Sequence, residues 1–67
     1  MSLRSELREN LKTWRFKRKM TQEVLAKESG VKRPTIAQFE NYGHPKFREL
    51  KRICKTLGVS SSDLLGF

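Results

Sequence analysis

The sequence has few of the residues that build catalytic or metal centres. Cys54 is the only cysteine and His44 the only histidine among 67 residues. The chain therefore cannot close an internal disulfide and holds no Cys/His metal cluster. It also lacks a glycine-rich phosphate loop and a cluster of acids, so no catalytic set can be assembled from it. We expect neither an enzyme nor a cofactor or metal site.

Long apolar runs are missing as well. No segment is hydrophobic enough to cross a membrane, and no signal-peptide pattern opens the chain. One isolated thiol suits a reducing compartment. These features predict a cytoplasmic protein, associated with the nucleoid if the source is a bacterium.

Acidic residues are scarce relative to basic ones. Seven Asp and Glu stand against fifteen Lys and Arg, which gives a formal net charge of +8. Such a surface attracts polyanions, because each phosphate that it neutralises releases condensed counterions. A lysine-rich soluble protein is the plainer alternative. An acidic membrane surface would require a helix with a bulky exposed apolar face, and the sequence has none.

The length predicts a single domain over residues 1–67, with a modest core. Periodicity and helix-end signals divide it into five helices and no strands. Thr21 is the expected N-cap of the second helix, and Gly30 its end. Ser60 and Asp63 form a capping-box pattern before the last helix. The expected helices run from about Arg4 to Lys17, from Gln22 to Gly30, from Lys32 or Arg33 onward, from Lys46 to Leu57, and from Ser61 to Leu65.

The apolar positions predict which faces are buried. The first helix carries a stripe formed by Leu3, Leu7, Leu11 and Trp14, and the fourth carries one formed by Phe47, Leu50, Ile53, Cys54 and Leu57. Phe16 lies off its stripe, so it either packs under Phe67 or contacts a partner, and we favour packing. Composition predicts a loop from Asn41 to Pro45.

The spacing around Gly30 is the most informative local pattern. Counting Gln22 as the first position, Leu25 is fourth, Ala26 fifth, Gly30 ninth, Ile36 fifteenth and Phe39 eighteenth. A small Ala26 allows close helix crossing, and Gly30 permits a tight reversal. Buried Ile36 and Phe39 would leave the opposite side of their helix free to meet a ligand.

The segment from Met20 to Asn41, MTQEVLAKESGVKRPTIAQFEN, resembles the helix-turn-helix of the phage lambda and 434 repressor and Cro family, the XRE-like group. The resemblance extends from about Leu7 to Leu65. It implies a compact all-α bundle of five helices, with the helix-turn-helix at about 22–41 and the recognition helix at about 32–41. It also implies a homodimer on palindromic operator DNA, in a cytoplasmic protein of phage or bacterial origin.

The resemblance also implies roles for individual residues. The positions that read base edges are Lys32, Arg33, Pro34 and Gln38, and those that contact phosphates are Gln22, Thr35, Asn41 and Lys46. Arg15 and Glu40 match a structural salt bridge between the first and third helices. Pro34 departs from relatives that carry a hydrogen-bonding side chain there, so no known operator sequence can be transferred.

The hydrogen-bonding chemistry of these side chains agrees in part with the roles that the resemblance implies. Arg33 can bond guanine O6 and N7, and Gln38 can pair with adenine N6 and N7. The positive charges of Lys32 and Arg33 oppose the helix dipole, and each costs the helix roughly 0.3–1 kcal/mol. A DNA phosphate lying opposite these residues would offset this cost. Gln22 could instead serve as a first-turn residue, and Asn41 as a turn residue. A fourth-helix basic set is read as a solvated face rather than a second DNA site; it comprises Arg48, Lys51, Arg52 and Lys55.

Two classes of function remain from the sequence. The first is a sequence-specific transcriptional regulator of repressor type that binds double-stranded DNA. The alternative is a protein-interaction module, such as an antitoxin or adaptor, that uses the same fold.

Overall fold

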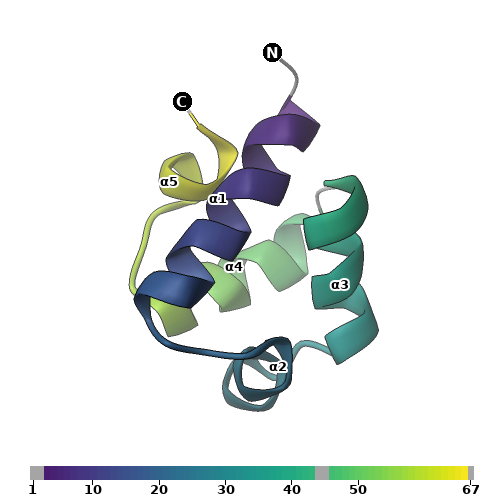
Figure 1. Ribbon diagram of the computed structural model, residues 1–67, viewed down its shortest axis with the longest axis vertical. Helices are drawn as coiled ribbons and strands as arrows, with labels where there is room; N and C mark the ends of the chain where they lie inside the picture. The colour runs from purple at the N-terminus through teal and green to yellow at the C-terminus, as the bar shows by residue number, and fades with distance from the viewer. Residues whose placement is uncertain (1–2, 44–45, 67) are drawn as a thin grey trace.

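The computed structural model describes residues 3–43 and 46–66, with side chains from residue 6 onward. This part of the chain contains five helices and no strand (Figure 1). The all-helical prediction is confirmed. The helices are α1 (Leu3–Lys17), α2 (Gln22–Ser29), α3 (Arg33–Tyr42), α4 (Phe47–Leu57) and α5 (Ser61–Leu65).

Short polar residues begin two of the helices as predicted. The Thr21 hydroxyl accepts the Val24 N–H at 3.1 Å and so caps α2. At α5 the capping box is complete, because the Ser60 hydroxyl accepts the Asp63 N–H and the Asp63 carboxylate accepts the Ser60 N–H. Each bond satisfies a backbone donor that has no partner inside the helix.

The end of α3 corrects the sequence prediction. Asn41 and Tyr42 are helical, so the loop predicted from Asn41 is wrong for these two residues. Gly43 ends the helix with φ +69°, and its N–H bonds the carbonyls of Gln38 and Phe39. Glycine adopts this left-handed conformation without steric cost, so it sets the helix end more strongly than the composition around it. The rest of the predicted loop, His44 and Pro45, lies outside the described residues.

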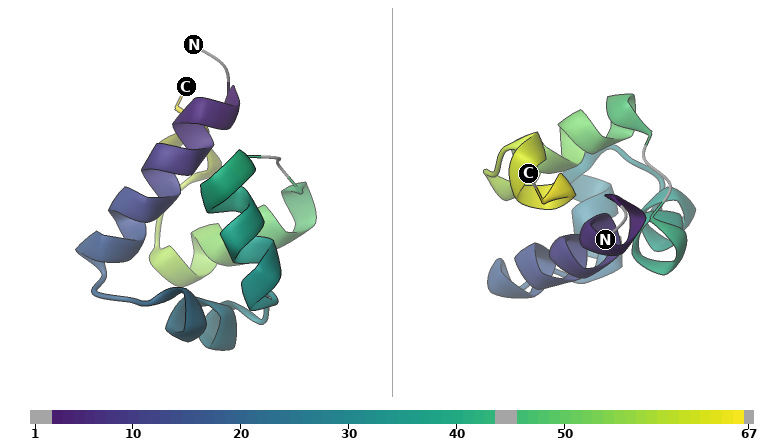
Figure 2. Two further views of the ribbon diagram at one scale, coloured as in Figure 1. Left: turned by 45° about the vertical axis from the view of Figure 1, so that its right-hand side comes forward. Right: turned by 90° about the horizontal axis from the view of Figure 1, so that it is seen from above.

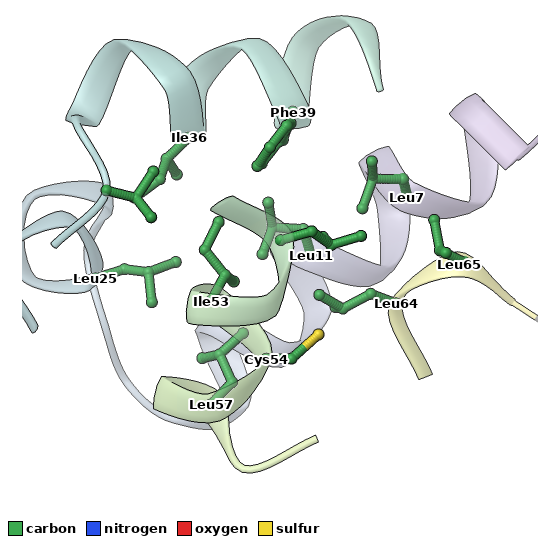
Figure 3. Close-up of a cluster of buried hydrophobic side chains, with 12 residues drawn as sticks. Leu7, Leu11, Leu25, Ile36, Phe39, Ile53, Cys54, Leu57, Leu64 and Leu65 are labelled. Atoms are coloured by element: carbon green, nitrogen blue, oxygen red, sulfur yellow. The ribbon is translucent and has the colours of Figure 1, made fainter. Parts of the chain in front are cut away.

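A single cluster of buried apolar side chains joins all five helices (Figure 3). Ile36 and Phe39 of α3 point into this core, toward side chains of α1 and α4. Cys54 belongs to the core as predicted, and its burial raises the pKa of the thiol above its usual value. Trp14 and Ala26 are half-buried against the cluster. The buried members are Leu7, Leu11, Leu25, Val31, Ile36, Phe39, Leu50, Ile53, Cys54, Leu57, Leu64 and Leu65.

One aromatic prediction is wrong. Phe47 was expected on the buried stripe of α4, but it is 65% exposed at the first residue of that helix. Phe16 is 66% exposed, and the Phe67 under which we expected it to pack lies outside the described residues. Helical periodicity gives the direction of a side chain around its axis, but not whether a neighbouring element covers that end of the helix.

The packing of the helices determines which surfaces are open. α1 packs on α3 and α5, while α4 packs on α2 and α5, and α2 meets α3. Seen from above, α1 and α4 lie on opposite sides of the molecule and α3 on a third side (Figure 2). The outer faces of α3 and α4 therefore point in different directions. No helix in residues 3–43 and 46–66 is long and apolar enough to span a membrane.

Candidate nucleic-acid interface

The turn between α2 and α3 is held by local hydrogen bonds. The Ser29 hydroxyl donates to the Leu25 carbonyl at 2.6 Å and accepts the Val31 N–H at 3.2 Å. Gly30 has φ +75°, and Val31 is buried. Together these contacts fix the reversal of the chain and the angle at which α3 leaves it.

Burial of one side of α3 leaves the predicted base-reading residues exposed. Ile36 and Phe39 are both fully buried. Arg33, Pro34 and Gln38 are exposed, and Lys32 is exposed at the N-cap. Pro34 and Gln38 are four residues apart and so share one face of the helix, while Lys32 and Arg33 lie at its start. All four predicted base-reading residues are therefore open to solvent.

Three of the residues predicted to contact phosphate lie on α3 or at the start of α4. Asn41 is exposed near the end of α3, and Thr35 is half-buried in its first turn. Lys46 is exposed at the N-cap of α4. It therefore follows α3 in the chain but belongs to a different helix.

Tyr42 extends the open face of α3 and was missed from the sequence. It lies one turn beyond Gln38 and is 59% exposed. The signal that could have found it is Gly43, since a glycine C-cap there makes Tyr42 the last helical residue. The exposed face of α3 therefore extends one residue beyond the helix that the sequence predicted at about 32–41.

The start of α3 is electrostatically unusual. Lys32 makes no side-chain capping bond, Pro34 supplies no N–H, and the first turn holds no acidic residue. Cations here face the positive end of the helix dipole. The arrangement disfavours the isolated helix and suits a nearby anion.

Gln22 lies half-buried at the start of α2 and is turned toward α3. Its Nε2 donates to Glu40 Oε1 at 3.2 Å. A side-chain amide carries two N–H donors, so this bond leaves one for another acceptor. The side chain thus links the beginning of α2 to the C-terminal half of α3.

Arg15 and Glu40 form an ion pair behind the interface. Arg15 Nε lies 2.8 Å from Glu40 Oε2, and Nη2 lies 3.0 Å from Oε1. Arg15 Nη1 also donates to the Met20 carbonyl at 2.8 Å. Both side chains are buried. The pair joins α1 to α3 and also holds the segment that leads into α2.

A basic segment follows at the end of α1. Lys17 and Arg18 each lie over the Trp14 ring, at 4.6 and 5.0 Å from its centroid. Arg18 Nε also donates to the Leu57 carbonyl at 2.9 Å, which ties α1 to the end of α4. Lys19 has φ +55° and is the only non-glycine residue in the described part of the chain with a positive φ.

A second basic surface lies on α4, and we call it the α4 basic stripe: Arg48, Lys51, Arg52 and Lys55. All four are exposed, on the side opposite the buried Leu50, Ile53, Cys54 and Leu57. Their spacings of three and four residues place like charges side by side on the helix. Each such neighbouring pair costs the helix roughly 0.2–0.5 kcal/mol.

Comparison with known families decides how this geometry is interpreted. A family model described as helix-turn-helix matches residues 11–64, which include both α2 and α3. The chain belongs to this family. It is the lambda repressor- and Cro-like group that the sequence resembled. Neither a curated protein nor a solved structure is significantly similar to the chain.

Membership of this family indicates the general class of activity of the domain. Helix-turn-helix domains of this family are DNA-binding regulators of transcription and are not typically enzymes. The match covers all of α2, α3 and α4. It therefore includes the whole open face of α3 and the buried pair behind it.

Proposed function

We propose that this helix-turn-helix domain, residues 1–67, is a sequence-specific repressor that inserts α3 into the major groove of operator DNA. The observation that supports this is the division of α3 into buried and exposed residues. Ile36 and Phe39 are fully buried, while Arg33 in the first turn and Gln38 are exposed. An α-helix fits the major groove, where each base pair presents a distinct pattern of donors and acceptors.

In this proposal the exposed residues at the start of α3 read base edges. Arg33 bonds guanine O6 and N7, and Gln38 bonds adenine N6 and N7. Lys32 reaches a guanine or an adjacent phosphate. Pro34 offers only apolar contact, which suits a thymine methyl group.

Phosphate contacts would fix the position of α3 in the groove. Thr35 and Asn41 lie on α3, Lys46 lies at the N-cap of α4, and all three carry hydrogen-bond donors. Gln22 contributes its second amide hydrogen, together with the free N–H groups at the start of α2. The Glu40 bond to Gln22 holds that amide in place before DNA arrives.

Two copies would act together. A homodimer on a palindromic operator places its recognition helices one helical turn apart, ~34–36 Å along the duplex. Such a protein works where the DNA is, in the cytoplasm of a bacterium, whether a phage or the host encodes it.

The decisive experiment is selection of bound duplexes from a random library, followed by gel shifts at increasing salt. We expect an enriched, two-fold symmetric site and an affinity that falls steeply with salt, because phosphate contacts release counterions. Absence of DNA binding at low salt would reject the proposal and favour a protein-interaction module. Binding without any enriched sequence would reject base reading by α3.

A further inference from the structure

The α4 basic stripe is not used by the proposed operator contacts. Its four side chains are exposed, and in the described part of the chain none of them donates a hydrogen bond or lies within ion-pair distance of an acid. Few acidic residues lie on α4 or on the helices that pack against it. Asp63 of α5 is bonded to the Ser60 backbone, while Glu23 and Glu28 belong to α2 and Glu49 to α4 itself.

The stripe and the exposed face of α3 point in different directions. Ile53 of α4 and Ile36 and Phe39 of α3 point into the same core (Figure 3). Two helices that turn their apolar sides toward one core direct their polar sides outward in different directions. A duplex lying against the outer face of α3 therefore does not run along the stripe.

The composition of α4 indicates a polyanionic ligand. Like charges at spacings of three and four residues destabilise a helix, and Arg48 in the first turn also opposes the dipole. A row of phosphates would reverse both effects. From Arg48 to Lys55 the helix rises about 10 Å, a length over which one DNA strand presents about three phosphates.

We propose that the α4 basic stripe binds the phosphate backbone of a second DNA segment, so that the protein bridges two duplexes. This inference rests on the proposed function for its first duplex. A membrane surface fits less well, because the apolar side of α4 is buried and only Phe47 at its start is exposed.

The test is a capture assay with the whole chain. A short random-sequence duplex is immobilised on beads, protein is bound at low salt, and retention of a second, labelled duplex is measured. The stripe variant carries Arg48→Gln, Lys51→Gln, Arg52→Gln and Lys55→Gln. Glutamine has a helix propensity close to that of Lys and Arg, so the stripe variant should melt at the same temperature as the unmodified protein or higher. A control of equal net charge carries Arg8→Gln, Lys12→Gln, Lys17→Gln and Lys27→Gln.

We expect the stripe variant to lose labelled-duplex capture by roughly tenfold or more, while the control retains it. In gel shifts on a single short duplex, the affinity of the stripe variant should fall with salt along the same slope as the affinity of the unmodified protein. Undiminished capture would show that the stripe is only solvated, or that two α3 surfaces of a dimer do the bridging. A single-duplex slope lowered by about 0.9 per lost contact would place the stripe on the first duplex. Either result overturns the inference. If the unmodified protein does not bind even a single duplex, the proposed function itself is rejected.

Discussion

Arg15 and Glu40 meet through two parallel hydrogen bonds, of 2.8 and 3.0 Å, in the buried space between α1 and α3. The carboxylate of Glu40 also accepts the amide of Gln22, and the guanidinium of Arg15 also donates to the Met20 carbonyl. One buried pair therefore ties together α1, the start of α2 and the C-terminal half of α3. This arrangement anchors α3 by its buried side.

We expect Glu40→Ala to lower the free energy of unfolding by about 3–5 kcal/mol, because it leaves the Arg15 cation buried without a partner. Thermal unfolding followed by circular dichroism measures the loss. Glu40→Gln keeps an acceptor oxygen and should lose less. Under conditions where each variant is folded, its affinity for DNA should change less than its stability. Glu28→Ala, an exposed glutamate on α2, serves as the control. An unchanged melting temperature for Glu40→Ala would mean that the Arg15–Glu40 pair contributes nothing to stability.

Arg33→Ala should relax base preference at one operator position and weaken binding by about 1–3 kcal/mol. The reason is the loss of a bidentate contact from the exposed side of α3. Repeating the selection from a random library with this variant measures the change. Lys27→Ala removes an equal charge from α2 and should leave base preference intact. If Arg33→Ala selects the same sequence with the same affinity, α3 does not read DNA at this residue.

Much of the fold could be predicted because its signals are local. Thr21, Gly30 and the pair Ser60–Asp63 mark helix ends through bonds that span only a few residues. The apolar spacing of Ile36 and Phe39 likewise predicts which side of α3 is buried. Such features depend on backbone geometry that the sequence controls directly.

The remainder depends on contacts between distant residues. Periodicity placed Phe47 on the buried side of α4, but its side chain is 65% exposed against the described residues. The bond from Gln22 to Glu40 joins residues 18 apart, and no local pattern indicates it. Tertiary packing decides both of these cases. The exposed position of Tyr42 depends instead on a local signal that the sequence does carry, because Gly43 ends α3 directly after it.

Lys19→Gly should stabilise the protein, although glycine usually destabilises. Lys19 has φ +55°, a left-handed conformation that costs an L-residue with a Cβ roughly 1–2 kcal/mol. Glycine removes this cost but loses more entropy on folding, so we expect a net gain of about 0.5–1 kcal/mol. Chemical denaturation measures it. Lys17→Gly, at the last residue of α1, should instead destabilise the protein, because it lowers helix propensity and removes the contact with the Trp14 ring. A destabilised Lys19→Gly protein would show that the lysine side chain itself supports the fold.

The capping box at α5 predicts a dependence of stability on pH. Hydrogen bonds from the Ser60 backbone and side chain lower the pKa of Asp63 below its usual value of 3.8. A carboxyl whose pKa is lower in the folded state stabilises that state above its unfolded pKa. The benefit disappears as the pH falls through the folded pKa.

Asp63→Ala should therefore lower the melting temperature at pH 7 and at pH values down to about 4, where the unfolded carboxyl begins to bind its proton. The difference from the unmodified protein should narrow as the pH falls further, since both then lack the charged acceptor. Thermal melts across this range, with Glu28→Ala as a control that carries no such cap, measure the difference. A gap that stays constant down to the lowest pH at which the protein is folded would show that the charge of Asp63 contributes nothing to the cap.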